Sequence, residues 1–392
     1  MTAPGGGAVD EVPHRAPDPD AVPRPATAGH AGSAPGAPAA SPTWRAAALR
    51  TRGFVALRGQ RADARNQWTA ALARRRVGLP RVGIPGAPDL AGALTDAGFA
   101  AGWRVVRGLP EPVAREAFRL GADLAARRDG PGVRRLRANL RRVVPAAPSE
   151  ELEALVRAGL RSYARYWCEA FRLPSMDRAA VLARTDPHVT GMAPMFEALE
   201  QGRGVVAALP HSGNWDLAGL WFVESQRRLG RPARFTTVVE RLRPESLFRR
   251  FVAYREGLGF EVLAAGDGPI VYRTLAERLR AGGLVCLVAD RDLNASGLEV
   301  SFFGESAKLP SGPARLAART GALLVPAFPS FTPDGWAATM GDPIPVPANG
   351  GPAAVAAATQ ALADALAALI ATAPQDWHML QRVWTADLRG GR

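Results

Sequence analysis

The chain has 392 residues, of which 47% are hydrophobic, so it can bury the core of one large domain or of two smaller ones. Its formal net charge is +13, which favours anionic partners such as an acidic membrane face or a phosphorylated cosubstrate. The two cysteines lack metal-ligand spacing, and no uncharged apolar stretch reaches about 18 residues, so neither a zinc site nor a spanning helix is expected.

Residues 1–85 differ in composition from the rest of the chain. Roughly the first 42 are rich in Pro, Ala, Gly and Asp, a composition that cannot bury a core, so we expect them to be disordered. Arginine clusters and turn residues follow, and we interpret them as a linker. The folded domain is expected over 86–388, with basic amphipathic helices over 86–200 and an α/β core over 201–388.

Residues 99–144 show apolar positions at spacings of three and four, which is typical of amphipathic helices. The segment carries eleven arginines against four acids, and its apolar side includes Trp103, Val106, Phe118 and Leu120. Two interpretations stay open at this point. The arginines form either a solvated face over a protein core or a surface that lies on an anionic membrane, with arginines toward the headgroups.

A further amphipathic helix is predicted over 150–173. Beyond it, short apolar runs alternate with helical segments. Strands are predicted at 204–209, 234–239, 260–264, 284–289 and 322–328, and an alanine-rich helix at 352–373. Strands that alternate with helices indicate an α/β fold, with a central mixed sheet flanked by helices and the amphipathic helices N-terminal to it.

A histidine and an aspartate follow the first of these strands, in 209-LPHSGNWDLAGLW-221. Turns at the carboxyl ends of strands carry the sites of open α/β sheets, and Ser212 or Asn214 can cap the helix that follows. His211 then lies near a helix N-terminus, and a turn brings Asp216 within its reach. A carboxylate on one imidazole nitrogen leaves the other nitrogen to deprotonate a hydroxyl. The alternative is a structural histidine beside a first-turn aspartate.

The order of apolar strand, His-x4-Asp and amphipathic helix resembles the first block of the glycerolipid (lysophospholipid) acyltransferase superfamily. The stretches 206-VAALPHSGNWDLAG-219 and 287–328 resemble the branch that contains lipid A lauroyl/myristoyl acyltransferases and actinobacterial phosphatidylinositol mannoside acyltransferases. The stretches 240–263 and 374-PQDWHMLQRVW-384 look most like the mannoside enzymes. The resemblance covers residues from about 90 to 388, and its motifs are long and ordered.

This resemblance implies an acyl-CoA-dependent O-acyltransferase with acyl-CoA as cosubstrate and no bound cofactor. It implies a palmitoyl-like donor chain and, as acceptor, a mannose hydroxyl of a glycophospholipid, phosphatidylinositol mannoside. The enzyme would lie peripherally on the cytoplasmic face of the plasma membrane, on its anionic surface. Two alternatives stay open: an acyltransferase for another glycolipid or a lysophospholipid, and a non-catalytic membrane binder. A nucleic-acid partner is disfavoured, because the arginines cluster on amphipathic helices instead of among exposed aromatic residues.

The resemblance also implies catalytic residues. His211 is expected to be the general base, oriented by Asp216. Asp290 and Asp292 are expected to support the catalytic centre, although spacing does not tell which of the two faces His211. No metal is expected, because the remaining histidines lack ligands at metal spacing.

A second group is expected to bind substrates. Its members are Glu240 and Arg255 in the acceptor groove, Arg291, Trp215, and Ser311 and Gly312 at the start of a helix. An arginine fork suits a lipid phosphate, and helix N–H groups suit a phosphate or a polarised carbonyl. The open alternatives are surface ion pairs for Glu240 and Arg255, and a plain helix cap for Ser311 and Gly312.

Overall fold

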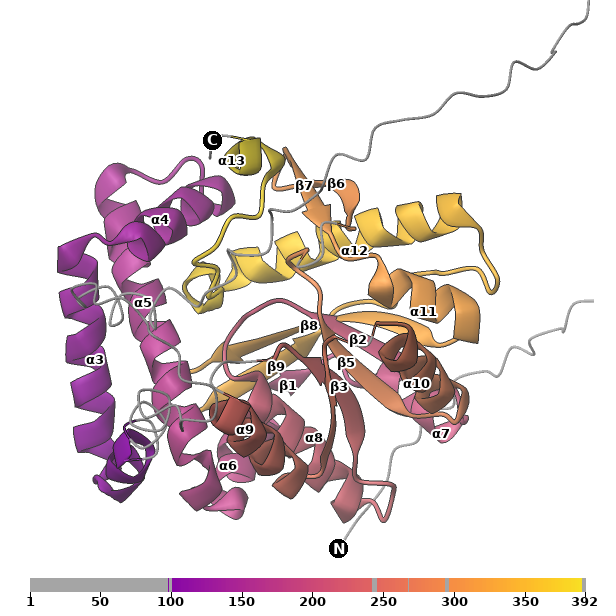
Figure 1. The fold of residues 1–392 in the computed structure, drawn as a ribbon, viewed down its shortest axis with the longest axis horizontal. Coiled ribbons are helices and arrows are strands. Elements are labelled where there is room, and N and C mark those ends of the chain that lie inside the picture. Colours follow the sequence, from indigo (N-terminus) through magenta and orange to yellow (C-terminus); the bar gives the residue numbers. More distant parts are fainter. Residues whose placement is uncertain (1–97, 99–100, 242–244, 267, 293–295, 390–392) are drawn as a thin grey trace, which may run out of the picture. The chain divides into compact units, whose positions relative to one another are not determined.

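The computed structural model describes residues 98, 101–241, 245–266, 268–292 and 296–389. The expected extension over 1–85 lies outside these residues. The described residues belong to one compact unit and form the α/β fold that the alternation of strands and helices predicted (Figure 1). A mixed sheet is flanked by helices, and a group of helices from earlier in the chain lies beside it.

Within the described residues, seven strands form the main sheet, in the order β1-β9-β8-β2-β5-β3-β4. Their bounds are β1 Val189–Thr190, β2 Val205–Leu209, β3 Phe235–Val239, β4 Phe260–Ala264, β5 Leu284–Val288, β8 Leu323–Phe331 and β9 Trp336–Met340. The central strands β8, β2, β5, β3 and β4 are parallel, whereas β9 is antiparallel to β8, so the sheet is mixed. Strands β6 (Leu298–Phe302) and β7 (Glu305–Leu309) form a separate hairpin.

Both faces of the sheet are apolar. Successive side chains of a strand point to opposite faces, and the central strands are apolar at nearly every position. In β2, Val206 and Ala208 join one core, and Val205 and Ala207 join the other. The first core includes residues of α10 (Gly268–Arg280), α11 (Gly312–Thr320) and α12 (Pro352–Thr372), and the second includes residues of α6 (Arg178–Thr185), α7 (Ala193–Glu200) and α8 (Trp215–Arg228). Helix α9 (Glu245–Gly257) packs against β4.

Three helices have a smaller core of their own: α3 (Glu111–Arg128), α4 (Pro131–Val143) and α5 (Ser149–Arg172). Leucines and valines at helical spacing, such as Leu136 and Leu140 of α4, are fully buried there. A short helix over 101–108 precedes α3, and Trp103 in it donates to the main-chain oxygen of Phe171 (2.8 Å). The 3-10 turns η1 (Leu173–Ser175) and η2 (Asp186–His188) connect this group to the sheet.

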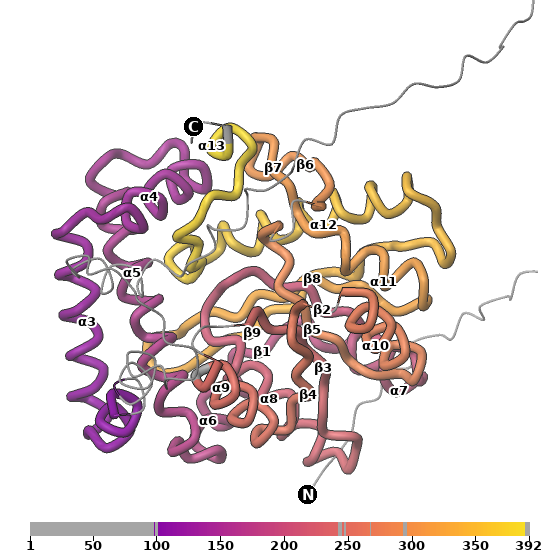
Figure 2. Tube along the Cα trace, viewed as in Figure 1, coloured from indigo at the N-terminus to yellow at the C-terminus, as the bar shows by residue number. Residues whose placement is uncertain are grey.

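The chain beyond α12 returns alongside α4 and α5 (Figure 2). This return contains the turn η3 (Pro374–Asp376) and ends in α13 (Thr385–Arg389). The buried side chain of Asn139 in α4 donates to the main-chain oxygens of Met379 (2.7 Å) and Gln381 (2.9 Å), which fixes the course of the segment. The return brings residues 376–378 beside the carboxyl end of β2.

Among the described residues, one helix is long and apolar enough to cross a bilayer by length and composition, and this is α12. One side of α12, with Leu362, Leu366 and Ile370, is buried in the core against β8 and the hairpin. Such a buried side is the pattern of a helix that covers a sheet.

Candidate active site

Three neighbouring strands end at the same edge of the sheet and are followed by titratable residues. Strand β2 pairs in register with β5, with Leu209 opposite Val288, and β5 lies next to β3. His211, Asp290 and Glu240 come directly after these strands. Because the carboxyl ends of parallel strands lie at the same edge, the pairing of β2, β5 and β3 brings these three residues to one edge although they are far apart in the sequence.

His211 is held by Asp290. Its Nδ1 lies 2.7 Å from Asp290 Oδ1, and its main-chain N–H donates to Asp290 Oδ2 at 2.9 Å. The carboxylate is fully buried, whereas 44% of the His211 side chain is exposed. Because an ionised carboxylate only accepts hydrogen bonds, Nδ1 carries the proton. When the ring carries only this proton, Nε2 is left as a possible base on an exposed side chain.

The charge of Asp290 is set by its partners. Burial alone would raise the pKa of this carboxyl, but attraction to His211 and three hydrogen bonds outweigh burial and hold the pKa below its usual value. Two of these bonds come from His211, and the third comes from the indole N–H of Trp377 at 2.8 Å. Asp290 is therefore ionised at neutral pH, as the orienting partner of a histidine base must be.

The structure corrects the expectation that Asp216 orients the imidazole. Both carboxylate oxygens of Asp216 accept from Arg255, whose Nε and Nη2 lie 2.7 and 3.2 Å away. Asp216 is fully buried, and Arg255 is 6% exposed. Since Asp216 is the second residue of α8, its side chain is carried into the core toward α9 and not along the loop toward His211.

The expected role of Arg255 in an acceptor groove is corrected by the same contacts. Burial opposes the charge of Arg255, but attraction to Asp216 outweighs it and raises the pKa of the guanidinium. The guanidinium also lies 4.3 Å from the ring centre of Trp215 and 5.4 Å from that of Phe251. The charge of Arg255 is therefore balanced inside the protein, and its nearly buried side chain is not placed in an open groove. The pair ties α9 to α8 behind the site.

Arg291 follows Asp290 at the same edge of the sheet. Burial lowers the pKa of its guanidinium, while Glu240 and Asp290 attract its charge. With the residues that the structure describes, Arg291 forms no hydrogen bond or close ion pair. Arg291 is therefore a cation near His211 and Asp290, and its N–H donors are not bonded to any described residue. Glu240 beside it is exposed.

Asp292, Ser311 and Gly312 were also expected at the site. Asp292 Oδ2 accepts from the main-chain N–H of Gly297 (2.7 Å), within the chain that follows β5. Ser311 is buried at the N-cap position of α11, and Gly312 is the first residue of that helix. The role of Asp292 in supporting the catalytic centre, and that of Ser311 and Gly312 in binding a substrate, stay predictions.

The loop between β2 and α8 has a fixed shape. Gly213 has φ +49°, and a Cβ at this position would lie 2.5 Å from the main-chain oxygen of Pro329, so the loop requires glycine. Asn214 Oδ1 accepts from the main-chain N–H of Leu217 (3.1 Å) and caps α8, as one of the two expected caps. Asn214 Nδ2 donates to the buried Glu169 at 2.8 Å.

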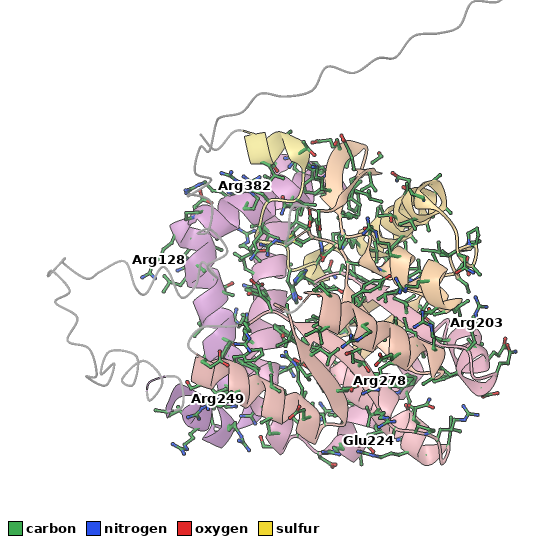
Figure 3. The ribbon with its side chains drawn as sticks, turned by 45° about the vertical axis from the view of Figure 1, so that its right-hand side comes forward. Arg128, Arg203, Glu224, Arg249, Arg278 and Arg382 are labelled. Carbon is green, nitrogen blue, oxygen red and sulfur yellow. The ribbon has the colours of Figure 1, made fainter. Side chains whose placement is uncertain are left out.

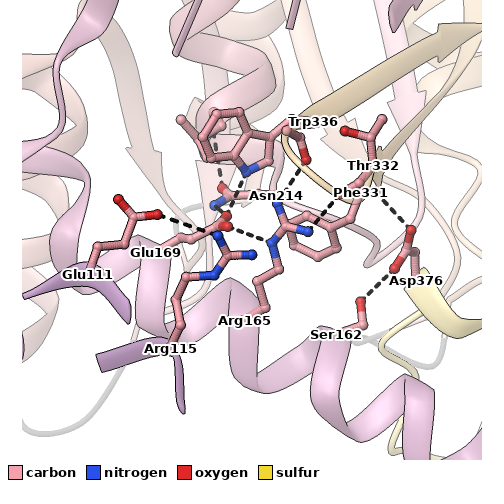
Figure 4. A network of polar contacts seen from close by, with 12 residues as sticks. Glu111, Arg115, Ser162, Arg165, Glu169, Asn214, Phe331, Thr332, Trp336 and Asp376 are labelled. Atoms are coloured by element: carbon pink, nitrogen blue, oxygen red, sulfur yellow. Dashed lines mark hydrogen bonds and ion pairs between the residues drawn. The ribbon is translucent and has the colours of Figure 1, made fainter. Parts of the chain in front are cut away.

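Glu169 of α5 connects this loop to the helices at the side of the sheet (Figure 4). Its Oε2 also accepts from Trp336 Nε1 (2.7 Å), and its Oε1 pairs with Arg165 (2.7 Å). Arg165 in turn donates to the main-chain oxygens of Thr332 (2.9 Å) and Gly335 (2.8 Å), between β8 and β9. Sequence reasoning missed Glu169, for which the available signal is an acid inside the apolar run 167-WCEAF-171.

Sequence reasoning also assigned no role to residues 376–378. The main-chain N–H of His378 donates to the main-chain oxygen of His211 (2.7 Å), and that of Gly213 donates to Asp376 (3.0 Å). The signal in the sequence was the tryptophan-containing motif around these residues, which resembled known enzymes without indicating a function. Its position in the fold shows that it braces the loop that contains His211.

The arrangement supports proton abstraction from a hydroxyl or a water molecule by His211 Nε2, with Asp290 stabilising the imidazolium that results. In the described ranges, no group of three or more His, Cys, Asp or Glu side chains could hold a metal ion.

Comparisons with known proteins agree with the resemblance seen in the sequence. A family profile described as bacterial lipid A biosynthesis acyltransferase matches residues 93–386. The chain is 50% identical over 311 residues to a phosphatidylinositol mannoside acyltransferase of Mycolicibacterium smegmatis, which covers 79% of this chain and 97% of that protein. It is 47% identical over 308 residues to a phosphatidylinositol mannoside acyltransferase of Mycobacterium tuberculosis, covering 76% of this chain and 91% of that protein.

Proposed function

Because this chain belongs to the bacterial lipid A biosynthesis acyltransferase family, we propose that it transfers a long-chain, palmitoyl-like acyl group from acyl-CoA to a mannose hydroxyl of phosphatidylinositol mannoside. The choice of acceptor rests on the names of the similar proteins. The mechanism rests on one observation, the pairing of the exposed His211 with the buried Asp290.

In this mechanism His211 Nε2 takes the proton of the acceptor hydroxyl as its oxygen attacks the thioester carbonyl. The tetrahedral intermediate collapses, the new ester bond stays, and the carbon–sulfur bond to CoA breaks. The proton held by His211 then passes to the CoA thiolate or to water. We propose direct transfer, without an acyl-enzyme on cysteine, because burial raises the pKa of Cys168 to about 11 and that of Cys286 to about 12 and so disfavours both thiolates at neutral pH.

We assign Arg291 to an anionic group of the acceptor, in place of the paired Arg255. An arginine whose donors are not already bonded can form charge-assisted hydrogen bonds to a phosphate. Glu240, exposed beside it, is a suitable acceptor for sugar hydroxyls.

Peripheral attachment to the cytoplasmic face of the plasma membrane is also part of the proposal, and it uses α3. Val113, Leu120 and Leu124 are 52%, 54% and 45% exposed and fall on one side of that helix. Arg127 and Arg128 end the helix, and Arg128 projects outward (Figure 3). Exposed apolar residues beside arginines suit the interface of an anionic membrane.

The arginines of α4 support this choice of helix because they pair with groups of the protein itself. Arg134 pairs with Asp129, Arg135 with Asp387, Arg137 with Asp129 and Glu153, and Arg142 with Glu305 and Asp387, while Arg141 donates to the main-chain oxygen of Ala147. Such residues hold the helices together. Of the expected apolar face, Leu120 points outward, whereas Trp103 and Phe118 pack on Phe171.

The experiment uses the full chain, labelled palmitoyl-CoA and a panel of acceptors: phosphatidylinositol mannoside, a lipid A precursor and a lysophospholipid. We expect label on the mannoside, and kcat lowered roughly 10²–10⁴-fold by His211→Ala. His188→Ala is the matched control, because His188 is exposed in η2. Arg291→Gln should raise KM for the mannoside and spare hydrolysis of palmitoyl-CoA by water. Label on another acceptor alone would overturn the acceptor, and full turnover of a folded His211→Ala variant would overturn the base.

A further inference from the structure

Asp290 carries a negative charge in a fully buried position and has three donors around its two oxygens. Oδ1 faces His211 Nδ1, and Oδ2 accepts from the main-chain N–H of His211 and from Trp377 Nε1. The first two donors belong to the histidine that Asp290 has to orient. Trp377 is therefore the one donor in this set that can fix the carboxylate independently of its catalytic partner.

Trp377 is itself held rigidly. It is fully buried, and its ring lies 6.1 Å from the rings of Phe302, Phe303 and Trp384. Phe303 has φ +51°, an uncommon conformation for a bulky residue, which the packing of the β6–β7 turn maintains. An indole enclosed by three aromatic rings keeps its N–H in one direction.

The main chain at Trp377 is fixed to the loop of the base. Trp377 forms an isolated antiparallel bridge with Ser212, made by the hydrogen bonds from His378 to His211 and from Gly213 to Asp376. The Asp376 carboxylate accepts from the Phe331 main-chain N–H (2.8 Å) and from the Ser162 hydroxyl (2.6 Å), which anchors the segment to β8 and α5 (Figure 4). One short segment thus holds both the main chain of the base and the side chain of its partner.

We infer that Trp377 is a positioning residue for acyl transfer, which sets the orientation of Asp290 and thereby that of His211. The inference rests on the proposed role of His211 as base. Without the indole donor, the carboxylate can rotate, and Oδ1 is no longer confined to the position that keeps the proton on Nδ1. The imidazole then spends less time with Nε2 directed at the substrate.

The test compares Trp377→Phe with Trp384→Phe. Trp384 is an equally buried tryptophan that packs on the same Phe302 (5.9 Å) and also donates one 2.8 Å hydrogen bond, but to the main-chain oxygen of Phe302. Both variants should lose similar stability in denaturant. The readout is release of CoA from palmitoyl-CoA in water, which does not depend on the identity of the lipid acceptor.

We expect Trp377→Phe to lower kcat roughly tenfold with KM for palmitoyl-CoA within about twofold, the loss that corresponds to one hydrogen bond to a charged group. Trp384→Phe should keep kcat within about threefold. In an Asp290→Asn background, Trp377→Phe should have little further effect, because residues that act through one another are not additive. If Trp377→Phe does not fold, 3-benzothienylalanine at position 377 keeps the bicyclic shape and removes only the N–H.

Equal losses of kcat in the Trp377→Phe and Trp384→Phe variants would overturn the inference. So would an undiminished loss in the Asp290→Asn background. These outcomes differ from failure of the proposed function, in which His211→Ala retains full CoA release.

Discussion

Replacing Asp216 distinguishes the two possible tasks of this residue. If Asp216 oriented the imidazole, Asp216→Asn would lower turnover and leave stability unchanged. In the structure its two oxygens instead accept hydrogen bonds from Arg255, and neither side chain has appreciable contact with water. We therefore expect Asp216→Asn to act mainly on the free energy of unfolding.

The magnitude follows from the burial of the pair. Removing one member leaves the charge of Arg255 in an apolar setting of Trp215 and Phe251, which typically costs about 3–5 kcal/mol. Domains of this kind are stable by about 5–15 kcal/mol, so the loss takes a large part of the total. The double variant Asp216→Leu with Arg255→Met removes both charges and should recover most of that loss.

The assay is urea denaturation followed by tryptophan fluorescence, with CoA release measured at a temperature at which each variant is folded. Asp123→Asn is the control, because Asp123 also receives two bonds from Nε and Nη2 of one arginine, Arg161, at 2.6 and 2.9 Å, but in an exposed contact; a third bond comes from Arg119 at 3.2 Å. An exposed pair of this kind contributes less than about 1 kcal/mol.

Under the same assay, Asp290→Asn should reverse the pattern, with turnover lowered by roughly 10²–10⁴-fold and the fold retained. A variant Asp216→Asn that unfolds like the wild type but releases CoA as slowly as Asp290→Asn would refute the assignment of Asp216 to the ion pair.

Two other predictions concern the membrane face and the response of stability to pH. Leu120→Gln and Leu124→Gln should each weaken binding to anionic vesicles by roughly tenfold, whereas Arg135→Gln should lower the melting temperature and leave vesicle binding unchanged; the reverse result would place the membrane face on α4. Burial, with a smaller repulsion from His211, lowers the pKa of His378 from 6.5 to about 3. Between these two pH values His378 is protonated in the unfolded chain and neutral in the folded chain. The free energy of unfolding should therefore fall as the pH drops from 6.5 toward 3, by about 1.4 kcal/mol per unit, and His378→Gln should remove that part of the slope in urea titrations at each pH.

The buried elements of the fold were readable in the sequence. The predicted strand at 284–289 is β5, Leu284–Val288, and the predicted helix at 150–173 is α5, Ser149–Arg172. The strand is an apolar run because both faces of the sheet are covered. The helix has apolar residues at helical spacing because one of its sides packs on the protein. Strands β1, β6, β7 and β9 were missed. Strand β1 has only two residues, 305-ESAKL-309 is largely polar and 336-WAATM-340 is rich in alanine.

The carboxylate that bonds His211 could not be predicted from the sequence, because its identity depends on the order of the strands. Asp216 is five residues from His211 in the chain, and Asp290 is 79 residues away. Proximity in sequence favoured Asp216, yet the turn at Gly213 and the start of α8 direct that side chain into the core. Asp290 becomes the neighbour of His211 because β5 pairs with β2, and no local pattern specifies which strands pair.

The same reasoning explains why the loop after β2 needs support from distant parts of the chain. In the proposed mechanism His211 has to be accessible to substrate, and 44% of its side chain is exposed, so burial does not fix its orientation. Three buried contacts orient it instead. Asp290 at the end of β5 bonds the imidazole, and the main chain of residues 376–378 bonds the loop. Glu169 of α5 bonds Asn214, which caps α8. Each of these supports is buried or made by the main chain, which holds one exposed imidazole in place without covering it.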